Sequence, residues 1–131
     1  MRSANAGRRR YDTGAMKVLW VYITAPDVVT ARRLAKRWVG ERLIACANIV
    51  PRIESVYWWK KKVERGVEAA LIVKTTASRW PALQAAVRRD HPYECPCVLA
   101  FGPSRGEPAF LAWIASETAL RRAPRARARR P

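Results

Sequence analysis

The stretch IVPRIESVYWWKKKVE, residues 49–64, sets three aromatic residues directly against three lysines. We predict that it forms a β-strand running into a charged turn. Successive side chains of a strand point to opposite faces, so Trp58 and Trp59 cannot enter the same core. We therefore expect other parts of the structure to cover both faces of this segment.

The segment belongs to a predicted hairpin that is too long for its own domain. The second strand covers residues 44–59, the turn falls at Lys61–Lys62, and the third strand starts near Val63. With about 15 residues per strand at roughly 3.3 Å each, either strand reaches about 50 Å. A domain of about 100 residues has a radius of gyration of about 13 Å. Pro51 marks a bulge or an edge position in the second strand.

The outer part of this hairpin carries apolar side chains that its own domain leaves in water. They are Val56, Tyr57, Trp58, Trp59 and Val63. Because an exposed apolar ribbon with an open edge aggregates, we predict that copies of the chain cover one another's hairpins in a closed cyclic assembly. Trp113 is a further candidate for this interface. The alternative is a strand that ends near Val56, with the aromatic residues folded back locally.

The remaining segments show alternating strand and helix patterns. Strands are expected at 17–25 and 95–103, and helices at 28–43, 79–90 and 106–120. The order β-α-β-β-α-β-α predicts an α+β, ferredoxin-like sandwich with an antiparallel sheet and helices on one face. The opposite face of the sheet stays uncovered within one chain.

Local signals predict the helix ends and the buried sides. Asp27, or alternatively Thr30, caps the first helix, and Ser78 caps the second. The side chains expected to point inward from the third helix are Phe110, Leu111, Ile114 and Ala115.

Length and charge indicate one folded domain between two basic ends. Half of the 131 residues are hydrophobic, and the formal net charge is +16. Residues 1–15 carry four arginines and one aspartate, and residues 121–131 carry six arginines and no acid. We predict a domain over 16–120, with Met16 as a candidate start, and disordered extensions on both sides. The tail is either a nonspecific contact for nucleic acid or a solvated end.

Hydropathy and cysteine content indicate the compartment. No apolar run approaches the roughly 18–20 residues that span a bilayer, and the short run at 18–23 does not make a signal peptide. Three cysteines cannot all pair internally, and reduced thiols fit the cytoplasm. We expect a cytoplasmic protein with no membrane partner.

Five motifs follow one another along the domain. They are TAPD (24–27), ERLIACANIVPRIESVYWWK (41–60), VKTT (73–76), HPYECP (91–96) and AFLAWIASE (109–117). With these motifs, residues 16–120 closely resemble the CutA divalent-cation tolerance family. The resemblance implies a homotrimer of ferredoxin-like subunits, similar in architecture to the nitrogen-regulatory PII proteins. It also implies a role in tolerance of copper and other divalent metals.

The sequence departs from the family pattern at four positions. Cys95 and Cys97 replace a commonly apolar or small residue and a commonly acidic one, and Ile23 stands where some members carry cysteine. These changes remove one thiol, at Ile23, and one carboxylate, at Cys97, that could have served as metal ligands in the role that the resemblance implies. Lys61 stands where glycine is usual, so the hairpin tip must turn without it.

The candidate metal ligands are one histidine and three thiols. His91, the only histidine, stands near Cys95 and Cys97, while Cys46 lies in the ACAN stretch. Thiolates and imidazole suit Cu(I) or Zn(II). No cofactor is required, and copper or another divalent metal is the expected ligand. The alternatives are buried cysteines that act as small hydrophobes and a His91 that shapes the turn after the second helix, with its ring hydrogen-bonded across a subunit boundary.

A second group of residues is expected to bind a small ligand between subunits. It comprises Lys74, Glu68, Tyr93 and Glu94. Lys74 either pairs with Glu68 or Glu94, or lines an anion-binding cleft. The leading hypothesis is a homotrimeric metal-tolerance protein that is not an enzyme, since no GxGxxG, P-loop or GxSxG motif occurs. The alternative is a PII-like signalling module that binds a small anion in the inter-subunit clefts. RNA binding would need exposed aromatic residues on the third strand, which offers none.

Overall fold

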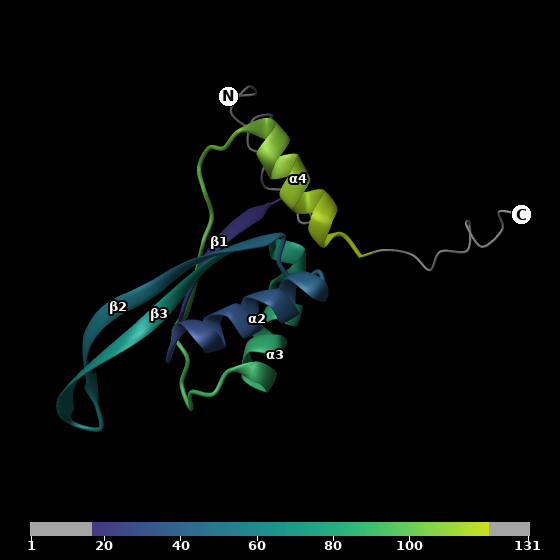
Figure 1. The fold of residues 1–131 in the computed structure, drawn as a ribbon. Helices are drawn as coiled ribbons and strands as arrows, with labels where there is room; N and C mark the ends of the chain where they lie inside the picture. The colour runs from purple at the N-terminus through teal and green to yellow at the C-terminus, as the bar shows by residue number, and fades with distance from the viewer. Residues whose placement is uncertain (1–16, 121–131) are drawn as a thin grey trace, which may run out of the picture.

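A computed structural model describes residues 17–120 as a four-stranded antiparallel sheet with three α-helices (Figure 1). The strands are β1 (Val18–Ala25), β2 (Cys46–Trp59), β3 (Lys62–Thr76) and β4 (Val98–Phe101). The helices are α2 (Val28–Gly40), α3 (Trp80–Asp90) and α4 (Pro108–Thr118), and a 3-10 turn, η2 (Ala77–Arg79), precedes α3. The strand order β2-β3-β1-β4 confirms the predicted ferredoxin-like fold. The predicted basic extensions and Met16 lie outside the described residues.

The cap of the first helix agrees with the sequence prediction, and the cap of the second does not. Asp27 Oδ1 accepts a hydrogen bond from the Thr30 N–H at 2.8 Å, which satisfies one free amide at the start of α2. The predicted cap by Ser78 is wrong: α3 begins without a side-chain cap, and the Ser78 hydroxyl pairs with that of Thr76 at 3.1 Å. Within residues 17–120, no helix is both long and apolar enough to cross a bilayer.

One face of the sheet forms the core with α2 and α3. Alternate β1 residues Val21 and Ile23 are fully buried and stand opposite Val73 and Leu71 of β3. Trp38 of α2 is also fully buried in this cluster. The apolar side chains that alternate along the strands thus pack in one core with those that recur at helical spacing on α2.

The other face of the sheet is largely uncovered, as predicted. Trp20 of β1 and Leu99 and Phe101 of β4 are exposed there, and the rings of Trp20 and Phe101 meet edge to face at 5.7 Å. A single chain therefore leaves a patch of large apolar side chains in water.

Helix α4 lies at the end of the sheet, beside the start of β1 and the end of β3 (Figure 1). Ile114 is buried, whereas Phe110 is exposed and stacks on Trp113 at 5.7 Å, so the prediction that Phe110 points inward is wrong. Only a narrow side of α4 packs against the sheet, because the helix crosses only the end of the sheet. Arg42 Nη1 fixes it by donating to Glu117 Oε1 at 2.6 Å.

The hairpin of β2 and β3 projects far beyond the helices (Figure 1). Its register slips between Val50 and Ile53, which confirms the bulge predicted at Pro51. The turn residues are Lys60 and Lys61, both with positive φ, so the tip lies one residue before the predicted turn. Two left-handed residues match the twist of a two-residue hairpin loop.

Beyond the bulge, both faces of the hairpin are exposed. Trp58 is 73% exposed and Val56 68%, and both point away from the face that carries Tyr57 and Trp59. The strand continues to Trp59, so the alternative in which the aromatic residues fold back near Val56 is wrong.

A buried carboxylate joins the two core helices. Asp90, at the end of α3, accepts a hydrogen bond from Trp38 Nε1 of α2 at 2.8 Å, and its side chain is only 3% exposed. Hydrogen bonds from Arg89 hold the pKa of Asp90 at about 2, and the Trp38 bond acts in the same direction, against the opposing effect of burial. Arg37 lies 3.3 Å from the same carboxylate. The charged form of Asp90 therefore stabilises the helix layer.

The low pKa of Asp90 predicts a loss of stability in acid. The stabilisation is complete above the unfolded-state pKa of 3.8 and is lost as pH falls towards about 2. The free energy of unfolding, measured by urea titration at stepped pH, should fall by about 2 kcal/mol more in the wild type than in Asp90→Asn over this range. Glu107→Gln is the control and should keep the wild-type slope. Equal slopes for the wild type and Asp90→Asn would contradict the assignment.

Candidate functional site

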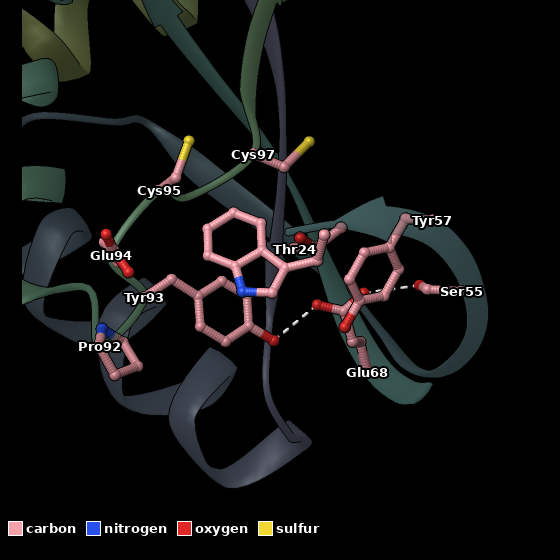
Figure 2. Close-up of a pocket in the computed structure, with 10 residues that line it drawn as sticks. Thr24, Ser55, Tyr57, Glu68, Pro92, Tyr93, Glu94, Cys95 and Cys97 are labelled. Carbon is pink, nitrogen blue, oxygen red and sulfur yellow. Dashed lines mark hydrogen bonds between the residues drawn. The ribbon is translucent and has the colours of Figure 1, made fainter. Parts of the chain in front are cut away.

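A cavity of about 650 Å³ lies where the loop after α3 meets the hairpin (Figure 2). Its lining comes from three strands and this loop, and comprises Thr24, Ser55, Tyr57, Trp59, Glu68, Pro92, Tyr93, Glu94, Cys95 and Cys97. Thr24 and Glu68 alternate with core residues, so they project from the sheet face opposite the helices. The loop at 91–97 covers that face locally and creates the cavity.

A hydrogen-bond network holds the loop against the hairpin. Glu68 Oε2 accepts from the Tyr93 hydroxyl and Glu68 Oε1 from the Ser55 hydroxyl, both at 2.6 Å (Figure 2). Burial, reinforced by the Glu68 carboxylate, raises the pKa of Tyr93. Tyr93 therefore stays a neutral donor, and its ring is fixed at the cavity wall.

His91 is buried beside the cavity, and both of its ring nitrogens are occupied. Its Nε2 lies 2.7 Å from the Thr24 carbonyl oxygen, and its Nδ1 accepts from the Tyr93 N–H at 3.1 Å. A carbonyl only accepts, so Nε2 carries the proton and the ring is neutral. These bonds lie within one chain rather than across the predicted subunit boundary, and they shape the turn after α3. A metal at His91 would have to displace one of them.

The structure places two of the three predicted thiol ligands at the cavity and the third outside it. Cys95 and Cys97 both line the cavity, but they precede β4, so the predicted strand at 95–103 is shorter and the two do not share a strand face. Burial raises the pKa of the Cys97 thiol, and the Glu68 carboxylate acts in the same direction. Cys46 stands at the start of β2, opposite Lys74, and does not line the cavity. All three thiols are free.

Of the four residues predicted to bind a small ligand between subunits, three line the cavity and one does not. Glu68, Tyr93 and Glu94 line the cavity. Lys74 does not: its Nζ bonds to Asn48 Oδ1, so the predicted pairing with Glu68 or Glu94 is wrong. Lys74 lies six positions after Glu68 along β3, roughly 20 Å along a strand, which is beyond the reach of a lysine.

Three lining residues were not singled out from the sequence, and two others take on a second role. Thr24, Ser55 and Pro92 were missed, although Thr24 and Pro92 belong to the TAPD and HPYECP motifs. Tyr57 and Trp59, predicted for the subunit interface, also line the cavity. Side chains two residues apart on a strand share a face, and this spacing along β2 could have predicted that Ser55 lies on the same face as Tyr57 and Trp59. The predicted interface residues Val56, Tyr57, Trp58, Trp59 and Trp113 are all exposed in the single chain.

The fold and the site together define a class of protein: a ferredoxin-like α+β domain with a long β2–β3 hairpin and a pocket under the loop after its second core helix. The family model described as CutA1 divalent ion tolerance protein matches residues 19–117. The chain belongs to the CutA1 divalent ion tolerance protein family.

Known proteins resemble the chain in sequence and in structure. The divalent-cation tolerance protein CutA of Archaeoglobus fulgidus is 42% identical over 95 residues, which cover 72% of this chain and 92% of that protein. The divalent cation tolerance protein of Thermus thermophilus has a solved structure with a TM-score of 0.76 and 39% identity, covering 78% of this chain and 99% of that one. Protein CutA 1, chloroplastic, of Oryza sativa is 39% identical over 117 residues, which are 88% of this chain but only 66% of that protein.

The two hydrogen bonds of His91 predict its tautomer. Because His91 is the only histidine, long-range ¹H–¹⁵N spectra of labelled protein show a single imidazole. We expect Nε2 protonated and Nδ1 unprotonated, with no change when one equivalent of Zn(II) is added. A proton on Nδ1, or ring nitrogens that shift with stoichiometric Zn(II), would overturn this account of the ring.

Proposed function

We propose that the protein is a homotrimer that binds a soft metal ion, copper in particular, at the boundary between subunits, and that it acts in metal tolerance without catalysis. The hairpin carries the proposal, since both of its faces are apolar and exposed beyond the bulge. Family membership supports the same function, because the relatives are named for divalent-cation tolerance.

The exposed hairpin is the reason for copies of the chain to associate. Trp58 and Val56 stand on one face, and Tyr57 and Trp59 on the other. Strand β2 is also the edge of the sheet, so its outer backbone groups lack a strand partner in the described chain. Burying apolar surface contributes roughly 25 cal/mol per Å². A closed ring of copies covers both faces and leaves no free edge.

The thiols at the cavity are the best metal ligands for this function. Cys95 and Cys97 are separated by one residue, and soft thiolates favour Cu(I). In residues 17–120, no three His, Cys, Asp or Glu side chains are grouped to hold a metal, so a further ligand would come from a neighbouring subunit. The raised pKa of Cys97 means that its thiol must lose a proton on binding. Metal affinity should therefore increase with pH.

The cavity gives no support to the alternative of an anionic ligand. Its lining includes the carboxylates of Glu68 and Glu94 and contains no basic side chain. Lys74, the cation expected to bind an anion, is held by Asn48 elsewhere on the sheet.

The free thiols support a reducing compartment. Cys46, Cys95 and Cys97 form no disulfide, and such thiols persist in the cytoplasm, where we place the protein. Nonspecific nucleic-acid binding by residues 121–131 stays a prediction, because those residues lie outside the described chain.

Trp58→Glu tests the assembly. The substitution introduces a charge on the hairpin face that we expect to be buried between subunits, where an unpaired charge costs several kcal/mol. Sedimentation velocity should show a trimer for the wild type and a monomer for Trp58→Glu. Val29→Glu, at an exposed apolar position on α2, is the matched control and should stay trimeric. A monomeric wild type, or a trimeric Trp58→Glu, would contradict the assembly.

Anaerobic titration with Cu(I), in competition with a chromogenic chelator, tests the metal site. The double variant Cys95→Ser/Cys97→Ser should weaken Cu(I) binding about 100-fold or more, because hydroxyls replace both soft ligands. Cys46→Ser is the matched control and should bind like the wild type. The site would be wrongly placed if Cys46→Ser lost binding, or if the double variant kept it.

A further inference from the structure

The cavity is acidic in a protein that is otherwise strongly basic. Residues 17–120 carry 16 lysines and arginines against nine acids, yet the cavity lining contains two carboxylates and no lysine, arginine or histidine. Glu68 is bonded only to hydroxyls, and Glu94 makes no side-chain hydrogen bond or ion pair in the described part of the chain. Two carboxylates therefore face the cavity without a cationic partner there.

Aromatic rings form much of the remaining wall. Tyr57, Trp59 and Tyr93 line the cavity, and the Tyr93 ring is fixed by its bond to Glu68 (Figure 2). The face of an aromatic ring attracts a cation within about 6 Å of its centroid. The Trp59 ring already has a cation at this range, because Lys60 Nζ lies 5.6 Å from its centroid.

We propose that this cavity is a binding site for an alkylammonium group, in which Tyr57, Trp59 and Tyr93 surround the cation and Glu68 and Glu94 balance its charge. A volume of about 650 Å³ suits a small organic molecule. A bare metal ion is a poorer match for the two carboxylates, because no ligand group of three is present in residues 17–120. The inference goes beyond metal tolerance and does not use the thiols.

The ammonium group has two sources. One is a free organic cation such as a methylated amine, which we take to be the ligand. The other is a lysine at the hairpin tip, Lys60–Lys62, of the same chain or of a neighbouring copy. Both sources supply the same alkylammonium group. The tip lysines do not themselves line the cavity, although Lys60 lies against the Trp59 ring of its wall.

The test uses the full-length reduced protein, freed of metal by a chelator, and follows binding by NMR titration. The probe is tetramethylammonium, compared with the uncharged tert-butanol and the anionic pivalate, which have similar shapes. We expect tetramethylammonium to bind at least about tenfold more tightly than either. Glu94→Gln and Tyr57→Leu should each weaken it about three- to tenfold. Glu107→Gln changes an exposed acid at the start of α4 that does not line the cavity, and should not weaken binding.

Two further variants separate the sources and separate this site from the metal site. If Lys60→Gln/Lys61→Gln/Lys62→Gln binds tetramethylammonium like the wild type, a free cation is the ligand; if it binds more tightly, the tip lysines occupy the same site. Cys95→Ser/Cys97→Ser should keep tetramethylammonium binding even where Cu(I) binding is lost. The inference is overturned by no saturable binding, by equal binding of tert-butanol, by preference for pivalate, or by unchanged binding in Glu94→Gln.

Discussion

The outer part of the β2–β3 hairpin carries apolar side chains on both faces, and the domain that it extends from covers neither face. This exposed stretch of the hairpin begins at the bulge after Val50, where the hairpin extends past the helices, and ends at the turn of Lys60 and Lys61. Alternation puts Trp58 on one face and Trp59 on the other, so no bend of the ribbon hides both. Other copies of the chain would cover both faces, and the edge position of β2 supports the proposal that a second copy pairs there.

The same hairpin ties assembly to the candidate site. Ser55, Tyr57 and Trp59 alternate along one face of β2 and contribute to the cavity wall, while Val56 and Trp58 occupy the other face. The loop after α3 completes the cavity through the bond between Tyr93 and Glu68. Association of copies along the hairpin would therefore also enclose the cavity, bringing side chains of a neighbouring subunit to its open side. In such an assembly, the proposed metal site and the proposed ammonium site would lie at the same subunit boundary, because both use the lining of this cavity.

Local signals predicted most of the fold. The order of elements, the Asp27 cap, the bulge at Pro51 and the uncovered sheet face all follow from spacing and from residues next to one another in the chain. Several details did not follow, because they depend on contacts between distant segments. Phe110 has helical spacing suited to burial, but α4 meets only the end of the sheet.

The site was less predictable than the fold. The HPYECP motif placed His91 and two cysteines near one another, but not the bonds to Thr24 and Tyr93 that occupy the imidazole. Charge alone predicts that Lys74 pairs with Glu68 or Glu94, but Lys74 lies further along β3 and bonds to Asn48 instead. That Tyr57, Trp59 and Tyr93 line the same cavity as two carboxylates depends on the register of the hairpin and the path of the loop, which no local pattern encodes.

Hydrogen–deuterium exchange on the outer half of β2 tests the central claim most directly. In an isolated chain, the amides of residues 53–58 that do not bond to β3 would face water and exchange at once. If copies of the chain cover the hairpin, these amides are protected at working concentration and lose protection together on dilution. Rapid exchange of these amides at high protein concentration would show that the hairpin stands free, and would contradict the account.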